Sequence, residues 1–312
     1  MTSDINSPAH TLVDKAIGVF CGGTSNEREI SLRSGKAIFD ALNSNGLKVR
    51  LIDTQDLLLH EFEYQNLDIV FIALHGSGGE DGSIQGVLDF KNIPYTGSKV
   101  EASKLAISKY QSKKLWRKKG IKTADFVILN KDNNWLESLE NLGGSVMVKP
   151  DTEGSSLGMS QAFNPKQLQD AFRTASKFSE KVIAEKLLTG PEYTVAILDG
   201  EALPSIQIQS QSKFYDFESK YLSNKTSFIC PSGLSSFQED EIQLLALEAF
   251  NSLGCEGWGR VDLMSDDKGA FNVLEVNTVP GMTKKSLFPK AAEVAGLSFE
   301  NLVVKILETA NL

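Results

Sequence analysis

Cysteine is scarce in this sequence, and so are long apolar runs and any excess of positive charge. The 312 residues include three cysteines, whose odd number and wide spacing indicate neither a disulfide framework nor a zinc site. No apolar run approaches the roughly 20 residues that span a bilayer, and no basic segment followed by an apolar one indicates a signal peptide. The net charge of −8 argues against a nucleic-acid partner. We therefore expect a globular, cytoplasmic protein with no nucleic-acid or membrane partner.

Apolar and polar segments alternate in a way that predicts three units. With 41% hydrophobic residues, the chain is long enough to form several cores. We expect an N-terminal α/β domain in residues 1–98, a central unit in 99–184 and a C-terminal unit in 185–312. In the first unit a strand-like run, a glycine pair, a helical pattern and two further strand-like runs follow one another, which is typical of an open parallel α/β domain. The expected fold class is α/β, or α+β over the whole chain.

Two polar clusters follow the predicted strands of the first unit. Glu27 lies in the cluster at 22–29, and His75 begins the cluster at 75–82. Ligands of open parallel sheets bind beyond the carboxyl ends of the strands, where both clusters are expected. Neither cluster has the spacing of G-x-G-x-x-G or Walker A. Glu27 could equally be an acidic residue favoured in the first turn of a helix, and His75 could be a structural histidine.

The central unit carries a lysine at the end of a predicted strand. A single lysine-rich helix is expected over 103–119, with the basic residues from Lys113 onward on a solvated face. An apolar strand then ends in Lys149-Pro150, and residues 151–160 form a loop rich in glycine and serine. A lysine charge beside backbone N–H groups and hydroxyls suits a phosphate. The same pattern is also compatible with a plain hairpin turn that has a lysine at the strand end.

The C-terminal unit begins with strand-like segments and then becomes polar. Residues 210–228 are polar and aromatic with weak periodicity, so we expect a mobile loop there, the usual place for a lid. A capping box over 236–239 is expected to open a helix that runs through Leu253.

The most informative stretch is a predicted β-hairpin. Apolar strands flank a polar turn at 265–269. Side chains alternate along a strand, so one face of the second strand is expected to carry Phe271, Val273, Glu275 and Asn277. Asp262 on the first strand is then expected opposite Glu275. Carboxylate and amide oxygens suit Mg²⁺, which usually also takes substrate phosphates, although a solvated hairpin end would show the same residue types.

Seven segments, taken in order, resemble one known family. They cover 22–35, 73–86, 148–160, 184–198, 219–222, 257–264 and 274–287. Together they are similar to the D-alanine–D-alanine ligase family of the ATP-grasp superfamily. The resemblance implies an ATP-grasp fold and an enzyme that joins two D-alanine molecules through an acyl phosphate, for peptidoglycan precursor synthesis. It also implies ATP as co-substrate, two Mg²⁺ ions (with Mn²⁺ as a substitute) and a homodimer.

The resemblance also implies roles for single residues. The ATP phosphates are expected at Lys109, Lys149 and Lys220, and the adenine and ribose at Glu185, Lys186, Leu188 and Glu192. The expected Mg²⁺ ligands are Asp262, Glu275 and Asn277. Glu27 is expected to bind the ammonium of the first D-alanine and to be coupled to the lid by Ser155 and Tyr221. The other expected contacts are Arg260 and the Gly281 N–H at the oxyanion, Ser286 and Leu287 at the second carboxylate, and His75 near the substrates with no assigned proton transfer.

The sequence departs from some relatives around the expected second-substrate site. Val279 and Lys284-Lys285 stand where some relatives carry small, polar or histidine residues. Tyr221 matches members that form dipeptides, so D-lactate or D-serine is the less favoured second substrate. Two competing hypotheses are a different ATP-grasp ligase and a non-catalytic binding protein. The first would share the metal ligands but not the context of Glu27, and the second would not need Arg260.

Overall fold

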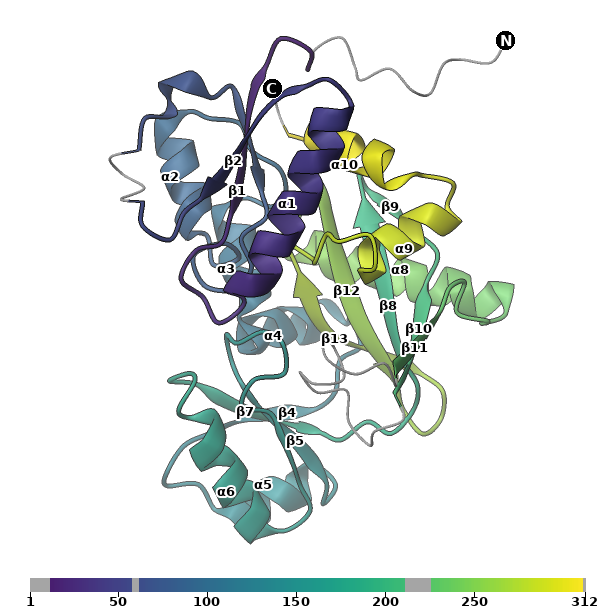
Figure 1. Cartoon of the computed structure of the whole chain (residues 1–312). Coiled ribbons are helices and arrows are strands. Elements are labelled where there is room, and N and C mark those ends of the chain that lie inside the picture. The colour runs from purple at the N-terminus through teal and green to yellow at the C-terminus, as the bar shows by residue number, and fades with distance from the viewer. Residues whose placement is uncertain (1–11, 58–61, 211–225, 311–312) are drawn as a thin grey trace.

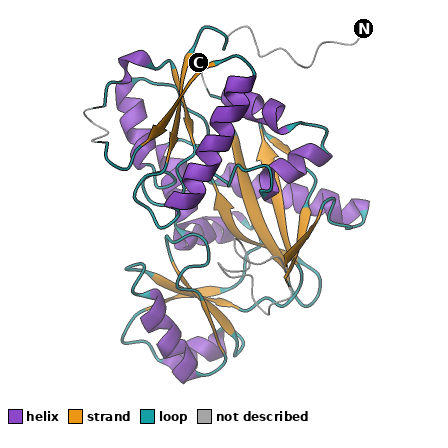
Figure 2. Cartoon of the chain, viewed as in Figure 1, coloured by secondary structure: helices purple, strands orange, loops and turns teal. Residues whose placement is uncertain are grey.

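The computed structural model describes residues 12–57, 62–210 and 226–310, arranged as three sheets with helices packed against them (Figures 1 and 2). In Figure 1 the N-terminal sheet lies at the top, the six-stranded sheet in the middle and the four-stranded sheet at the bottom. Most of the expected lid, including Lys220 and Tyr221, lies outside the described residues, as does most of the polar N-terminal segment. Among the described helices, none has both the length and the apolar character that a bilayer span requires.

The N-terminal sheet is parallel, as expected. It has the order β2-β1-β3 and is built from β1 (Ala16–Cys21), β2 (Lys48–Asp53) and β3 (Ile69–Ile72). Helices α1 (Arg28–Ser44) and α2 (Ser83–Lys91) belong to this unit, and α2 had no clear signal in the sequence. The C-terminal helices α9 (Leu287–Val294) and α10 (Phe299–Glu308) share its apolar core. The chain therefore returns at its end to complete its first domain.

The second sheet is antiparallel. Helices α5 (Trp135–Asn141) and α6 (Pro165–Ala175) pack against it and share its apolar core. Its order is β4-β7-β5-β6, built from β4 (Phe126–Leu129), β7 (Val182–Lys186), β5 (Val146–Pro150) and β6 (Ser160–Ala162). Because β7 lies in the middle of this sheet, a boundary between residues 184 and 185 would cut through a strand. We place the end of this unit after Lys186 instead.

The third sheet has six strands, which pair antiparallel wherever the pairing is described. Its order is β11-β10-β8-β12-β13, with β9 beside β8, and its strands are β8 (Glu192–Leu198), β9 (Glu201–Ala202), β10 (Ile206–Ser210), β11 (Thr226–Ile229), β12 (Trp258–Ser265) and β13 (Phe271–Asn277). The ends of the expected lid are therefore strand residues. Helix α8 (Ser236–Ser252) covers one face. Its capping box is formed by Ser235 and Gln238, one residue earlier than the sequence suggested.

The single helix expected over 103–119 is two helices, α3 (Val100–Ile107) and α4 (Lys109–Lys119). The chain breaks at Ser108, whose backbone is extended. The carboxylate of Asp151 accepts hydrogen bonds from the Ser108 hydroxyl (2.8 Å) and from the Tyr110 N–H (2.7 Å), so it caps α4 from another segment. The break places Lys109 in the first turn of α4.

The basic face expected on this helix is only partly solvated. Arg117, Lys118 and Lys119 are exposed, but Lys113 is fully buried. Helices α3 and α4 pack with α8 against the six-stranded sheet, so they share a core with the C-terminal unit rather than with the four-stranded sheet.

The predicted hairpin is confirmed, and Asp262 lies opposite Glu275. The expectation that every second residue from 271 to 277 shares one face is wrong, because the register shifts beside Asp262 and leaves Leu274 as an extra residue in β13. A β-bulge of this kind reverses the alternation that follows it. Phe271 and Val273 therefore lie in the core, whereas Leu274 and Glu275 both line a cavity.

Candidate functional site

Two adjoining cavities lie along the six-stranded sheet. The larger cavity has a volume of about 690 Å³ and is lined from both antiparallel sheets. The smaller cavity, about 490 Å³, lies between the six-stranded sheet and the N-terminal domain. Glu192, Asp262 and Glu275 line both. Every site residue expected from the sequence and described by the structure lines one cavity or the other.

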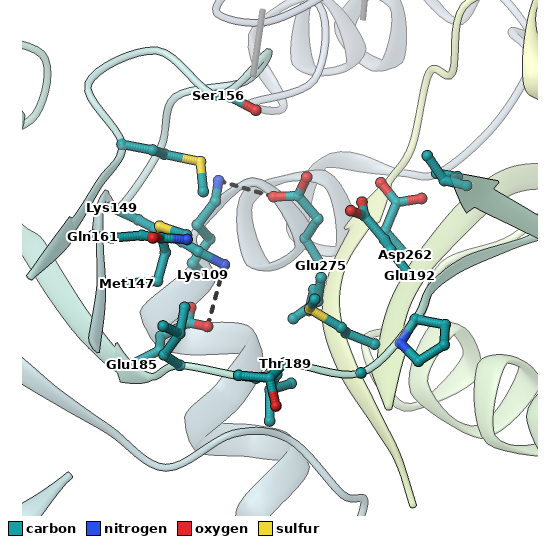
Figure 3. Close-up of a pocket in the computed structure, with 18 of the residues that line it drawn as sticks. Lys109, Met147, Lys149, Ser156, Gln161, Glu185, Thr189, Glu192, Asp262 and Glu275 are labelled. Atoms are coloured by element: carbon teal, nitrogen blue, oxygen red, sulfur yellow. Dashed lines mark hydrogen bonds and ion pairs between the residues drawn. The ribbon is translucent and has the colours of Figure 1, made fainter. Parts of the chain in front are cut away.

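The larger cavity combines apolar walls with lysines and carboxylates (Figure 3). Its apolar lining comes from both sheets and from loops beside them, and it includes Met147, Leu188, Ile208, Met264 and Leu274. Apolar walls of this kind suit a planar ring system, and the charged groups between them would orient it.

Glu185 and Lys149 form an ion pair in this cavity, with 3.2 Å between Nζ and Oε2 (Figure 3). The buried Lys113 approaches the same oxygen from behind, at 3.4 Å. Burial alone would raise the pKa of Glu185, but the charges of Lys113 and Lys149 hold it below its ordinary value. This carboxylate is therefore ionised at neutral pH.

Lys109 connects the two sheets across the larger cavity. Its Nζ donates to the Glu153 carbonyl (2.8 Å) and pairs with Glu275 Oε2 at 3.2 Å (Figure 3). Although burial lowers the pKa of this lysine, Glu275 and other nearby carboxylates raise it above its ordinary value. Lys109 is thus a fixed cation beside the hairpin, well placed for an anion.

The hairpin end gathers oxygen atoms. Asp262 accepts two hydrogen bonds from the Arg260 guanidinium, both 2.8 Å long, and one from the Asn277 amide at 3.0 Å. Thr194 also donates to Asp262, at 2.6 Å. Asp262, Asn277 and Glu275 thus lie together, and the two carboxylates are held by cationic and neutral donors.

Glu27 is enclosed by two loops from different parts of the chain. Ser155 donates a short hydrogen bond to its carboxylate. A Cβ atom at Gly154 would lie 2.6 Å from Glu27 Oε2, and one at Gly76 would lie 3.0 Å from it. Only glycine allows both backbones to approach this carboxylate so closely. An acidic residue that merely favoured a helix terminus would not need this enclosure.

His75 has a hydrogen-bond partner on each ring nitrogen. Nδ1 lies 2.7 Å from the Val279 carbonyl, which can only accept, so Nδ1 carries the proton. Nε2 lies 3.0 Å from the Ser34 hydroxyl and accepts from it in the neutral ring. Ser34 in turn accepts from the Met282 N–H at 3.1 Å. Burial lowers the pKa of His75 below its ordinary value, which agrees with a neutral ring that positions a loop rather than transfers protons.

Glu80 supports the same loop, and no local sequence pattern marks it. Its carboxylate accepts from the Gly76 N–H (2.7 Å) and from the Val279 N–H (3.2 Å). Removal from water, together with the charge of Glu27, raises the pKa of Glu80 to about 8. Both polar groups of the Val279 backbone are therefore held by the N-terminal domain. We call Ser34, His75 and Glu80 the loop clamp.

The clamped loop leads into the start of α9 at the smaller cavity. Gly281, Ser286 and Leu287 line this cavity, and Ser286 is the N-cap of α9. A helix N-terminus offers backbone N–H groups to an anion. Lys285 and Arg33 line the same cavity, whereas Lys284 turns away to pair with Glu300 at 2.8 Å.

Sequence reasoning missed Lys113 and two members of the loop clamp, Ser34 and Glu80. Lys113 follows Lys109 by one helical turn, so the two lysines lie on the same face of α4. The burial of Lys113, however, depends on sheets whose strands are distant in sequence. Ser34 and Glu80 became significant only when the loop at 279–282 was brought against them.

Comparison with known proteins gives consistent results. A family model described as D-ala D-ala ligase C-terminus matches residues 115–308, and one described as D-ala D-ala ligase N-terminus matches residues 54–98. The chain is 47% identical to D-alanine–D-alanine ligase of Saccharophagus degradans, covering 93% of this chain and 92% of that one. It is 48% identical to the enzyme of the same name from Pseudoalteromonas atlantica, covering 94% of each.

Solved structures agree. D-alanine–D-alanine ligase from Bacillus anthracis superposes with a TM-score of 0.85 and 35% identity, covering 95% of this chain and 97% of that one. The Bacillus anthracis enzyme in complex with ATP gives a TM-score of 0.82 at 32% identity, with the same coverage.

Proposed function

The chain belongs to the D-alanine–D-alanine ligase family, and on that premise we propose how its two cavities carry out the ATP-dependent joining of two D-alanine molecules. The observation that carries the proposal is that the larger and smaller cavities meet at Asp262 and Glu275. A phosphoryl group can pass from one cavity to a substrate in the other only at such a boundary. The product, D-alanyl-D-alanine, serves peptidoglycan precursor synthesis.

We place ATP in the larger cavity, with its base between the apolar walls and its phosphates toward the hairpin. A relative of known structure binds ATP, and both Lys109 and Lys149 lie in this cavity. Glu192 at the boundary and Glu185 with Lys186 and Leu188 farther in would contact the ribose and base. Lys109 would move from Glu275 toward the phosphates when they arrive.

The residues at the hairpin end fit a divalent cation. Two carboxylates and an amide oxygen, from Asp262, Glu275 and Asn277, form the oxygen-only set that Mg²⁺ prefers. Both carboxylates now hold side-chain cations, so they already tolerate a positive charge beside them. Bound there, Mg²⁺ (or Mn²⁺) neutralises phosphate charge as a Lewis acid.

The first D-alanine is placed with its ammonium at Glu27 and its carboxylate toward the boundary. A carboxylate oxygen attacks the γ-phosphorus of ATP, and the bond to the bridging oxygen of ADP breaks. Glu27 fixes the ammonium, because its carboxylate lies within the enclosure of Gly76, Gly154 and Ser155. The product of this step is an acyl phosphate and ADP.

The second D-alanine is placed with its carboxylate at the start of α9, near Ser286 and Leu287. Its amine attacks the acyl carbon, phosphate leaves, and the amine loses a proton. Arg260 and the Gly281 N–H line the smaller cavity and would balance the charge of the tetrahedral intermediate. The loop clamp holds Gly281 in place, since it binds residues 279 and 282 on either side.

Two further features complete the proposal. We propose a homodimer, as in the family resemblance, which light scattering at several concentrations would test. Reliance on ATP and on the precursor D-alanine also agrees with a cytoplasmic location.

The function is tested by measuring phosphate release from ATP with D-alanine, D-lactate, D-serine or L-alanine, with and without Mg²⁺, and identifying products by mass. We expect release and D-alanyl-D-alanine with D-alanine and Mg²⁺ only. Mixed products with D-lactate or D-serine would change the second-site assignment. No turnover with any of them would overturn the proposed function.

A further inference from the structure

Lys113 is the most unusual charged group outside the residues that line the cavities. Its side chain has no solvent exposure, and it lies behind the larger cavity without lining it. A buried lysine is costly unless it is paired, so its position requires an explanation.

The contacts of Lys113 join both antiparallel sheets. Its Nζ lies 3.4 Å from Glu185 Oε2 on β7 and donates to Thr123 Oγ1 at 2.5 Å. Thr123 in turn donates to the Val273 carbonyl on β13 at 2.7 Å. One chain of polar contacts thus runs from the six-stranded sheet, through Lys113, to a carboxylate at the wall of the larger cavity.

The two carboxylate oxygens of Glu185 differ in their hydrogen-bond partners. Oε2 receives both lysines, Lys113 and Lys149. Oε1 is buried and has no hydrogen-bond partner among the described residues. A buried carboxylate oxygen without a donor is costly, and a ligand N–H in the larger cavity would satisfy it.

We propose that Lys113 is a positioning and specificity-determining residue for the nucleotide base. It binds Oε2 of Glu185, so that Oε1 is left to accept a hydrogen bond from an exocyclic amino group. This rests on the proposed use of ATP. Adenine carries a 6-amino donor, whereas hypoxanthine and guanine carry a 6-oxo acceptor. An oxo group would place an acceptor against a carboxylate oxygen, and a site built for a donor rejects such an analogue strongly.

The main test replaces Lys113 by methionine, which keeps the length of the buried chain and removes its charge. The matched control is Lys118→Met, at an exposed position of the same helix. Turnover with ATP is compared with turnover with inosine triphosphate at saturating D-alanine. We expect Lys113→Met to lower the preference for ATP roughly tenfold, the scale of one hydrogen bond to a charged group, with the KM for D-alanine unchanged. Equal losses with both nucleotides, or an unchanged preference, would overturn the proposal.

A pH profile gives a second readout that a merely structural lysine would not move. Burial, together with the charges of Lys149 and Arg117, lowers the pKa of Lys113 to about 8 against the raising effect of Glu185. The Phe126 ring on β4 also lies near it, with its centroid 5.9 Å from Nζ. ADP binding is measured by calorimetry from pH 7 to 9.5 without D-alanine, so that the amine of the substrate does not titrate.

Wild-type affinity for ADP is expected to fall as the pH rises through 8, because Lys113 loses its charge. Lys113→Met is expected to bind more weakly at pH 7 and to lack this dependence. The same pH dependence in both proteins would contradict the proposal.

If Lys113→Met does not fold, Thr123→Val carries the test. It removes the second anchor of Lys113 at nearly constant shape, and we expect a smaller shift of base preference in the same direction. An unchanged preference there would overturn the proposal. Ligation by the wild-type protein is measured separately, so absence of dipeptide formation would count against the proposed function, and an unchanged base preference in an active ligase would count against the role of Lys113.

Discussion

The larger and the smaller cavity differ in how their charged groups are held. In the larger cavity, lysines from a strand and from α4 neutralise carboxylates of the two antiparallel sheets, as in Lys149–Glu185 and Lys109–Glu275. In the smaller cavity, Glu27 and Glu80 lie near each other, and backbone and hydroxyl donors supply their described hydrogen bonds. The first arrangement suits a ligand that carries several negative charges. The second suits a zwitterion, whose ammonium can pair with Glu27, a carboxylate that has no ion pair with any described residue.

The two cavities also differ in what builds them. Regular strands line much of the larger cavity, so its geometry follows from strand register. The smaller cavity depends on loops from both ends of the chain, which the loop clamp joins. We therefore expect substitutions in the clamp to affect the handling of amino acids and to spare nucleotide binding.

The largest effect is expected for Arg260→Met, at the boundary between the cavities. Loss of a donor to the oxyanion should lower kcat by roughly 10²–10³, while ADP affinity changes little. Steady-state ligation and calorimetry check this, with Arg173→Met on the exposed face of α6 as control. Near-normal turnover would show that Arg260 serves only to neutralise Asp262.

The next effect is expected for Glu27→Gln, which removes charge from the smaller cavity alone. The KM for the first D-alanine should rise on the order of tenfold or more, because a buried ammonium loses its carboxylate. Glu29→Gln is a matched control, since Glu29 lies exposed in the first turn of the same helix. If both variants behaved alike, Glu27 would merely favour the helix terminus.

A smaller effect is expected for Ser34→Ala, which removes one member of the loop clamp. His75 loses a donor and the Met282 N–H loses an acceptor, so kcat should fall several-fold, the scale of one or two hydrogen bonds. The affinity for ADP should remain that of the wild type. The control is Ser44→Ala at the end of α1, which should leave both kcat and the ADP affinity unchanged. A loss of nucleotide affinity would show that the two cavities are not separable in this way.

The smallest effect concerns stability and pH. The pKa of Glu80 is about 8 in the folded protein against an ordinary value of 4.5, so the folded state binds the extra proton within this window. The contribution of Glu80 to stability therefore becomes less favourable as the pH rises from about 4.5 to 8. The melting temperature of Glu80→Gln relative to wild type should be higher at pH 8 than at pH 5.5. A difference that is constant with pH would contradict the assignment.

Local pattern determined much of this protein. The alternation of strands and helix in the first domain and the hairpin around residues 265–269 follow from short-range preferences of the chain. The pairing of Asp262 with Glu275 needed more than the hairpin, because the register at the turn alone would set Asp262 opposite Leu274 and the bulge shifts it by one residue. Residues carried over by resemblance, such as Glu27 and Lys149, line the cavities, although their roles remain proposals.

Long-range packing decided the rest. The break at Ser108 depends on Asp151, the burial of Lys113 on strands β7 and β13, and the role of Glu80 on Val279. The bulge at Leu274, which directs Glu275 into the cavity, has no signal in an alternation of residue types. Sequence periodicity reports which side of an element is apolar. It cannot report which distant carboxylate or backbone group will meet a polar side chain, because that depends on how separate sheets and loops pack together.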